Sequence, residues 1–224
     1  MERQFVDLPS GNLEFTVERG ESARLLFVFF EKSVSQKISL HVKKDATLEV
    51  AYADFGRGKS NIDADIYLEE EGAKASFHGA FLASEKDLKE VKANCFHLAP
   101  HTEGLVENYG ITEGQSRLLF LGKSDIQRGA KGSITRQAAK AIVFDPKCVA
   151  HASPILCIDE NDVQASHAAA VGKLNDQHLF YLLSRGIDLR EARRLITLGY
   201  LKPIEEYFDG ELKERIDAAI EGGV

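Results

Sequence analysis

The sequence predicts a mainly β protein in which a strand-rich core is followed by a small α-helical region. From about Leu25 to Ala170, apolar and polar residues alternate with period two in short runs separated by turn residues. This pattern is typical of strands with one buried face. After Gly172 the apolar residues adopt the spacing of amphipathic helices. We therefore expect a core over residues 1–172 and a helical region over residues 173–224.

The strands are expected in consecutive short segments. In residues 61–68, NIDADIYL, apolar residues occupy every second position. Residues 75–82, ASFHGAFL, follow a turn and place Phe77 and Phe81 on the face opposite His78. Further strands are expected at residues 37–42, 47–55, 90–99, 104–111, 116–126, 132–144 and 153–158.

About ten short strands without a long helix between them predict a sandwich, a barrel or a solenoid. The strand-plus-turn units recur at roughly the length of one solenoid coil. Small residues also crowd the late segments QAAKAIVF and ASHAAAVG, where stacked coils leave little room. Both observations favour the solenoid.

Four helical segments are expected after the core. The first, NDQHLFYLLSRG, ends at Gly186, and the second begins after Asp188, an N-cap residue, and ends at Gly199. Pro203 suits the first turn of a third, short helix, and an amphipathic segment completes the sequence.

Composition restricts the class of protein. The formal net charge of -7 disfavours nonspecific binding to nucleic acid, which requires clustered cations. The N-terminal residues lack a signal peptide, and the longest apolar run, LLFVFF, is only strand-sized, so we expect a cytosolic protein that does not enter a membrane. The three cysteines form no CxxC pair, and we expect free thiols.

Residues 165–200, ASHAAAVGKLNDQHLFYLLSRGIDLREARRLITLGY, resemble the C-terminal signature of the SufB/SufD family of the SUF iron–sulfur cluster assembly system. Residues 147–156, KCVAHASPIL, also resemble the family stretch that leads to the last strands. The resemblance implies a right-handed parallel β-helix, followed by a helical region that docks the ABC-type ATPase SufC.

Several departures point to a short, SufD-like member. The resemblance implies an N-terminal helical region in longer family members, and we do not expect one within this sequence. The scaffold subunit SufB has a glutamate-rich context around its histidine and a cysteine one strand earlier. Here SHAAAVG surrounds His167, and Ala138 or Ala139 stands in the expected cysteine position.

His167 and Cys148 are the candidate ligands for iron or a cluster. Small residues flank His167 and leave its imidazole accessible to a metal; the alternative is a half-buried strand histidine bonded to backbone. Cys148 lies beside Lys147 and three residues before His151, a setting that favours the thiolate; the alternative is an inert turn cysteine.

The other two cysteines are expected to be structural. Cys157 alternates with Ile155 and is expected to be buried. Cys95 shares a face with His97, and His101 lies nearby, but no acid or third ligand is evident in that run.

The helical region supplies candidate docking residues for the ATPase, because arginine and aromatic side chains are enriched in interface anchors. They are Arg190, Arg193, Arg194, Leu195, Tyr200, Tyr207 and Phe208. The alternative is that the helices only cap the open end of the solenoid.

The resemblance implies a non-catalytic SUF subunit that binds a SufC-like ATPase and either a SufB-like partner or a second copy of itself. We expect no tightly bound cofactor, and only transient contact with iron or a cluster. An alternative within the family is a minimal homodimeric scaffold that ligates the nascent cluster through His167 and Cys148. A solenoid carbohydrate-active enzyme is a further alternative, although the chain has no Trp for sugar platforms.

Overall fold

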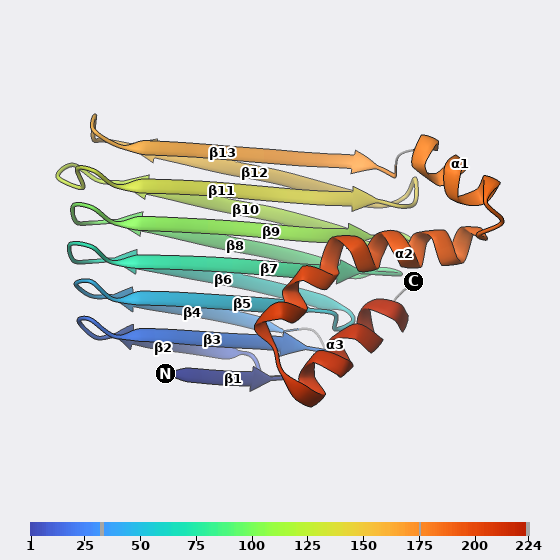
Figure 1. Cartoon of the computed structure of the whole chain (residues 1–224), viewed down its shortest axis with the longest axis horizontal. Coiled ribbons are helices and arrows are strands. Elements are labelled where there is room, and N and C mark those ends of the chain that lie inside the picture. Colours follow the sequence, from blue (N-terminus) through green and yellow to red (C-terminus); the bar gives the residue numbers. More distant parts are fainter. Residues whose placement is uncertain (32–33, 175, 223–224) are drawn as a thin grey trace.

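Most of the chain forms a parallel β-solenoid (Figure 1). The computed structural model describes residues 1–31, 34–174 and 176–222. Their strands form a seven-stranded sheet in the order β1-β3-β5-β7-β9-β11-β13 and a six-stranded sheet in the order β12-β10-β8-β6-β4-β2. Each coil adds one strand to each sheet, and the paired strands of the described chain run parallel. The predicted solenoid is therefore confirmed over the alternative sandwich and barrel.

The described strands are β1 (Glu2–Val6), β2 (Gly11–Val17), β3 (Ser22–Phe29), β4 (Ser35–Val42), β5 (Thr47–Asp54), β6 (Lys59–Leu68), β7 (Lys74–Ala83), β8 (Leu88–His97), β9 (Glu103–Thr112), β10 (Arg117–Ile126), β11 (Ile134–Val143), β12 (Val149–Ile158) and β13 (Gln164–Lys173). The helices are α1 (Asp176–Ser184), α2 (Leu189–Leu201), η1 (Lys202–Tyr207) and α3 (Gly210–Gly222). No helix within the described ranges is long and apolar enough to cross a membrane.

The period-two pattern positions the core inside the coils. Phe77 and Phe81 are fully buried in the lumen, whereas His78 lies on the outer face of the seven-stranded sheet, as predicted. Aromatic rings stack from coil to coil, with centroids 5.4 Å apart for Phe27 and Tyr52. Because the coils stack in register, lumen-facing apolar residues mostly lie over apolar residues of the next coil. This explains why the alternation persists along the chain.

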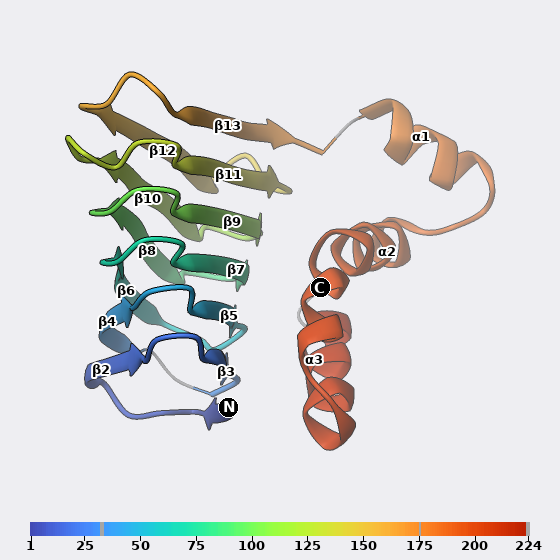
Figure 2. The same cartoon turned by 60° about the vertical axis from the view of Figure 1, so that its left-hand side comes forward.

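The helical region lies beside the coils and does not cover their end (Figures 1 and 2). Small residues on the outer face of the seven-stranded sheet, Ala51, Ala53 and Ala80, let α2, η1 and α3 approach closely. Leu201 and Phe208 are among the helical residues that form a second apolar cluster with this face. The capping alternative is therefore wrong for the described chain, because the helices bury themselves against a sheet face. The division into two domains at Gly172 stays a prediction.

The helix boundaries follow the predicted signals with one exception. Asp188 caps α2, its Oδ1 accepting the Glu191 N–H at 2.9 Å. Gly186 has a φ of 83°, which suits a helix stop. Pro203 lies in the first turn of η1 as expected. The predicted stop at Gly199 is wrong, because α2 continues to Leu201 and buries that side chain.

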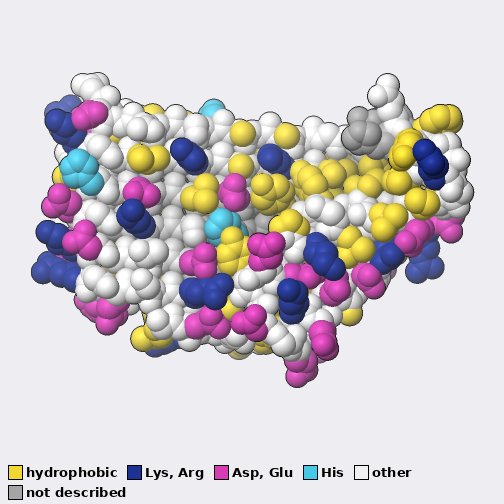
Figure 3. All heavy atoms as spheres, in the orientation of Figure 1, with side chains coloured by type: hydrophobic (Ala, Val, Ile, Leu, Met, Phe, Trp, Pro, Cys, Tyr) yellow, Lys and Arg dark blue, Asp and Glu magenta, His cyan; other side chains and the backbone are white. Residues whose placement is uncertain are grey.

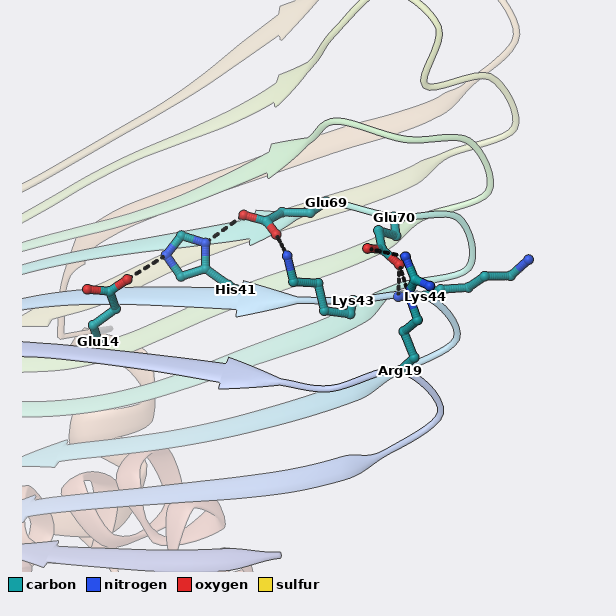
Figure 4. A network of polar contacts seen from close by, with 7 residues as sticks. All are labelled: Glu14, Arg19, His41, Lys43, Lys44, Glu69 and Glu70. Atoms are coloured by element: carbon teal, nitrogen blue, oxygen red, sulfur yellow. Dashed lines mark hydrogen bonds and ion pairs between the residues drawn. The ribbon is translucent and has the colours of Figure 1, made fainter.

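Ion pairs join coils near the ends of β2, β4 and β6, His41 with Glu69 across one coil step and Arg19 with Glu70 across two (Figure 4). His41 Nδ1 lies 2.6 Å from Glu69 Oε1, and Lys43 pairs with the other oxygen of Glu69. Arg19 holds Glu70 by two bonds of 2.7 and 3.0 Å. These pairs are partly exposed, so we attribute to them coil register more than stability.

A polar layer crosses the lumen around Cys95 and His97, which share one face of β8 as predicted, and both are buried. Cys95 Sγ lies 3.6 Å from His97 Nε2, and His97 Nδ1 lies 2.8 Å from Thr102 Oγ1. Burial raises the pKa of the Cys95 thiol to about 12 and lowers the pKa of His97 to about 4. His101 lies in an exposed turn. The pair is thus neutral and structural at neutral pH.

We expect Gly110→Ala to lower the free energy of unfolding by about 1–3 kcal/mol, the usual cost of overpacking. A Cβ at Gly110 would lie 2.2 Å from Leu118 Cδ2. Gly172→Ala is the matched control, since its Cβ would meet nothing within 4 Å. Urea unfolding monitored by circular dichroism measures both, and equal midpoints for the two variants would contradict the packing.

His97 should make the protein less stable in acid. Its folded pKa of about 4 lies below the ordinary value of 6.5, so between these two pH values the unfolded chain binds a proton that the folded chain does not. The contribution of neutral His97 to the free energy of unfolding is complete above pH 6.5. It is lost as the pH falls towards 4, by up to about 3 kcal/mol. Urea unfolding across this range should be less pH-dependent in His97→Asn, and an unchanged slope would refute this assignment.

Candidate functional site

The last coil, formed by β12 and β13, leaves the solenoid open at one end (Figure 2). Ile126 and Ile158 are register partners in the six-stranded sheet, yet Ile126 is fully buried and Ile158 is 46% exposed. Val171, in the other sheet, is 43% exposed although its partner Ala141 is buried. We call the lumen-facing residues Ile158, His167 and Val171, together with the free edges of β12 and β13, the open end. It is core surface that no described coil covers.

His167 belongs to this open end. The register places it after Phe77, Val106 and Gln137 in one lumen-facing column. The three preceding members are buried, whereas His167 is exposed. A histidine on an accessible strand can offer one ring nitrogen to a metal. The half-buried alternative does not describe its position, while its role as a ligand stays a prediction.

Cys148 lies in the turn between β11 and β12, half-buried, with the Ser116 Oγ 3.9 Å from its sulfur. His167 pairs with Gln137, six residues before β11 ends at Val143. At the rise of a β-strand this is about 20 Å along the coil. One chain therefore does not bring the two predicted ligands together. No group of three or more His, Cys, Asp or Glu side chains with metal-binding geometry occurs among the described residues.

The prediction that Cys157 is buried is wrong. Its register partner is Asp125, on the outer face of the six-stranded sheet, and Ile155 shares that face and is 50% exposed. The lumen-facing residues of β12 are instead Leu156 and Ile158, the partners of Ser124 and Ile126. In SPILCI, residues 153–158, both faces of the strand carry apolar side chains, so alternation alone did not identify the buried face.

Several predicted docking residues hold the helical region to the solenoid. Arg193 makes an ion pair of 2.8 Å with Asp145, in the turn that contains Cys148, and its guanidinium lies over the Phe144 ring. Arg194 pairs with Glu191 and Glu221, which joins α2 to α3. These two arginines therefore have intramolecular roles.

The predicted aromatic residues also face inward. Phe208 is 1% exposed within the second apolar cluster. Tyr200 packs edge-on against Tyr109, and Tyr207 stacks on His78, both on the sheet face. Of the seven predicted docking residues, Arg190 and Leu195 are exposed.

The exposed apolar surface of the helical region lies mainly on α1, which contacts α2 and projects beyond the coils (Figure 2). Phe180 is 72% exposed, Tyr181 57% and Leu183 42%, and Leu189 and Leu195 of α2 are exposed as well. We call these five residues the α1 patch. Sequence reasoning missed Phe180 and Tyr181, although the run LFYLL held a signal. Five consecutive apolar residues in a helix cannot all face one core.

Arg193→Ala should loosen α2 from the turn between β11 and β12. The half-buried ion pair and its bond to the Phe144 carbonyl would be lost, at a cost of about 1–3 kcal/mol in local stability. Arg190→Ala removes an exposed arginine from the same helix and should cost less than about 0.5 kcal/mol. Hydrogen exchange of α2 amides measures the difference, and equal protection in both variants would contradict the role of Arg193.

Comparison with known proteins places these features in one family. The family model described as "SUF system FeS cluster assembly, SufBD core domain" matches residues 15–200. The iron–sulfur cluster assembly protein SufD of Bacillus subtilis is 29% identical over 161 residues, which are 72% of this chain and 37% of that protein. A SufBD family protein of Mycobacterium tuberculosis is 28% identical over 183 residues, which are 80% of this chain and 22% of that protein.

A SufBD family protein of Staphylococcus epidermidis is 28% identical over 133 residues, which are 59% of this chain and 29% of that protein. The chain thus spans between 22% and 37% of the lengths of these relatives. The match nonetheless covers both the coils and α2. The chain belongs to the SufBD core domain family of the SUF iron–sulfur cluster assembly system.

Proposed function

We propose that this chain is a non-catalytic subunit of a SUF-type complex that helps to assemble or pass on iron–sulfur clusters. In this proposal the cluster is cargo that the chain holds transiently, and the chain binds no resident cofactor. The observation that carries the proposal is the open end, where core-like surface and His167 are exposed together. Family membership supports the reaction context.

The open end suits pairing with a second SufBD core, either a SufB-like subunit or another copy of this chain. The outer edges of β12 and β13 carry no further strand in the described chain, and free edges are templates for strand addition. Ile158 and Val171 supply apolar surface beside these edges. A second core placed here would continue both sheets and cover His167.

The helical region suits docking of a SufC-like ABC ATPase through the α1 patch. Phe180 and Tyr181 are the most exposed of its aromatic residues, and large aromatic residues are common anchors of interfaces. Arg190 on α2 adds an exposed cation beside this surface. Arg193 then connects α2 with the turn that holds Cys148, so force on the helices would reach the last coil.

The accessible position of His167 also favours a second candidate function, a homodimeric scaffold. Since His167 and Cys148 are about 20 Å apart along one coil, a cluster held by both residues would need ligands from two chains. Pairing of two open ends would bring two copies of His167 into one interface. The predicted ligand set is compatible with this arrangement only in the dimer.

Co-expression with the ABC ATPase of the same organism tests both surfaces. Size-exclusion chromatography with light scattering should show that Phe180→Ser with Tyr181→Ser loses the ATPase, whereas Ile158→Asp loses the second core and keeps the ATPase. Leu98→Asp, in an exposed turn away from both surfaces, is the control and should lose neither. An intact chain that binds no ATPase would refute the proposed complex.

Anaerobic reconstitution with iron and sulfide separates the two roles. As a homodimeric scaffold, the chain alone should form a chromophore that disappears in both His167→Ala and Cys148→Ala. As an accessory subunit it should form none alone, and His167→Ala should slow cluster formation in the full complex. Cys157→Ala, which removes an exposed thiol on the outer face, is the control for adventitious iron. A full complex indifferent to His167→Ala would exclude both roles for this residue.

A further inference from the structure

A cavity of about 260 Å³ lies where the helical region meets the seven-stranded sheet. Strands β7 and β9 form its floor, and the end of α2 together with η1 forms its wall. Above it the outer face of the sheet is no longer covered by helices, and acidic and apolar side chains lie close together around this junction (Figure 3). The residues that define its chemistry are His78, Glu107, Tyr109, Tyr200, Glu206 and Tyr207.

Aromatic rings line this cavity from both sides. Tyr109 and Tyr200 meet nearly at right angles with centroids 5.6 Å apart. Tyr207 stacks on His78 at 4.9 Å. The faces of such rings attract cations. Lys140 already demonstrates this for Tyr109, because its Nζ lies 5.4 Å from the ring centroid.

Carboxylates supply negative charge beside the rings. Glu107 Oε2 lies 3.3 Å from His78 Nδ1, and Glu206 lines the cavity from η1. Burial lowers the pKa of His78 despite the nearby carboxylates of Glu107 and Glu49. The imidazole is therefore uncharged at neutral pH and adds no positive charge beside Glu107. Glu49 itself is bonded to Arg24 at 2.7 Å.

We propose that this cavity binds an organic cation, a guanidinium or alkylammonium group, between its tyrosine rings and the carboxylates of Glu107 and Glu206. Aromatic faces combined with carboxylates form the setting in which such groups are held. The cavity volume accommodates a side-chain-sized group. This inference does not depend on the proposed SUF complex.

Titration with N-acetylargininamide tests the site, with N-acetylcitrullinamide as the neutral probe of the same shape and tetramethylammonium as the alkylammonium probe. The chain has no Trp and 6 Tyr, of which Tyr109, Tyr200 and Tyr207 line the cavity, so tyrosine fluorescence reports occupancy directly. Calorimetry supplies the dissociation constant. Both cations should bind, and the citrulline probe should bind at least about tenfold more weakly.

Glu107→Gln and Tyr200→Leu should each weaken binding by between about twofold and thirtyfold, the range for a single contact of this kind. Glu90→Gln and Tyr67→Leu, on the outer face of the six-stranded sheet, are the matched controls and should leave it unchanged. Equal affinity for the arginine and citrulline probes, or no binding of either cation, would overturn the proposal.

The same titration on the complex with a partner protein distinguishes two sources of the cation. Loss of probe binding on complex formation, without loss of binding to the free chain, supports a site filled by a lysine or arginine side chain of the partner. Unchanged binding supports a site for a free organic cation. In the free chain, equal effects of Glu90→Gln and Glu107→Gln would instead indicate general charge attraction and overturn the site.

Discussion

The structure depends on the stacking of one coil on the next. A lumen-facing side chain in this solenoid is buried by its own coil and by the register partners above and below it. Burial is therefore a property of neighbouring coils and not of one strand alone. Wherever the stack ends, residues with the chemistry of a core become surface. Ile126 and Ile158 show this directly, since they are partners with opposite exposure.

The helical region follows from the same geometry. The outer face of the seven-stranded sheet accepts the helices where its side chains are apolar, and small residues such as Ala51, Ala53 and Ala80 lie in that region. Helices placed there leave the end of the stack uncovered (Figure 2). The protein thus keeps two exposed surfaces of different kinds, a strand edge at the open end and an apolar helix at the α1 patch.

Charge connects these parts. Arg193 reaches from α2 to the turn before β12, and Arg194 holds α2 to α3. At the other edge of the helical region, where α2 passes into η1, the sheet carries the polar residues His78, Glu107 and Tyr109, which line the cavity. In α2 and η1, Arg193 and Arg194 therefore hold the structure together, whereas Tyr200 and Tyr207 line the candidate binding cavity.

The sequence by itself determined a strand-rich core, the helical region after it and the family, because period-two alternation, capping residues and the motif around His167 are local patterns. Alternation alone left sandwich, barrel and solenoid open, and the length of the units, the small residues and the family resemblance favoured the solenoid. It also predicted that Cys95 and His97 share one face of a strand. Only the tertiary structure decided which residues are free. Arg193, Arg194 and Phe208 have interface-like chemistry but are held within the chain, whereas Phe180 and Tyr181 are exposed. Cys157 faces outward and His167 is about 20 Å from the turn with Cys148. These outcomes depend on register and on the absence of a further described coil, which bring together or separate residues far apart in the sequence.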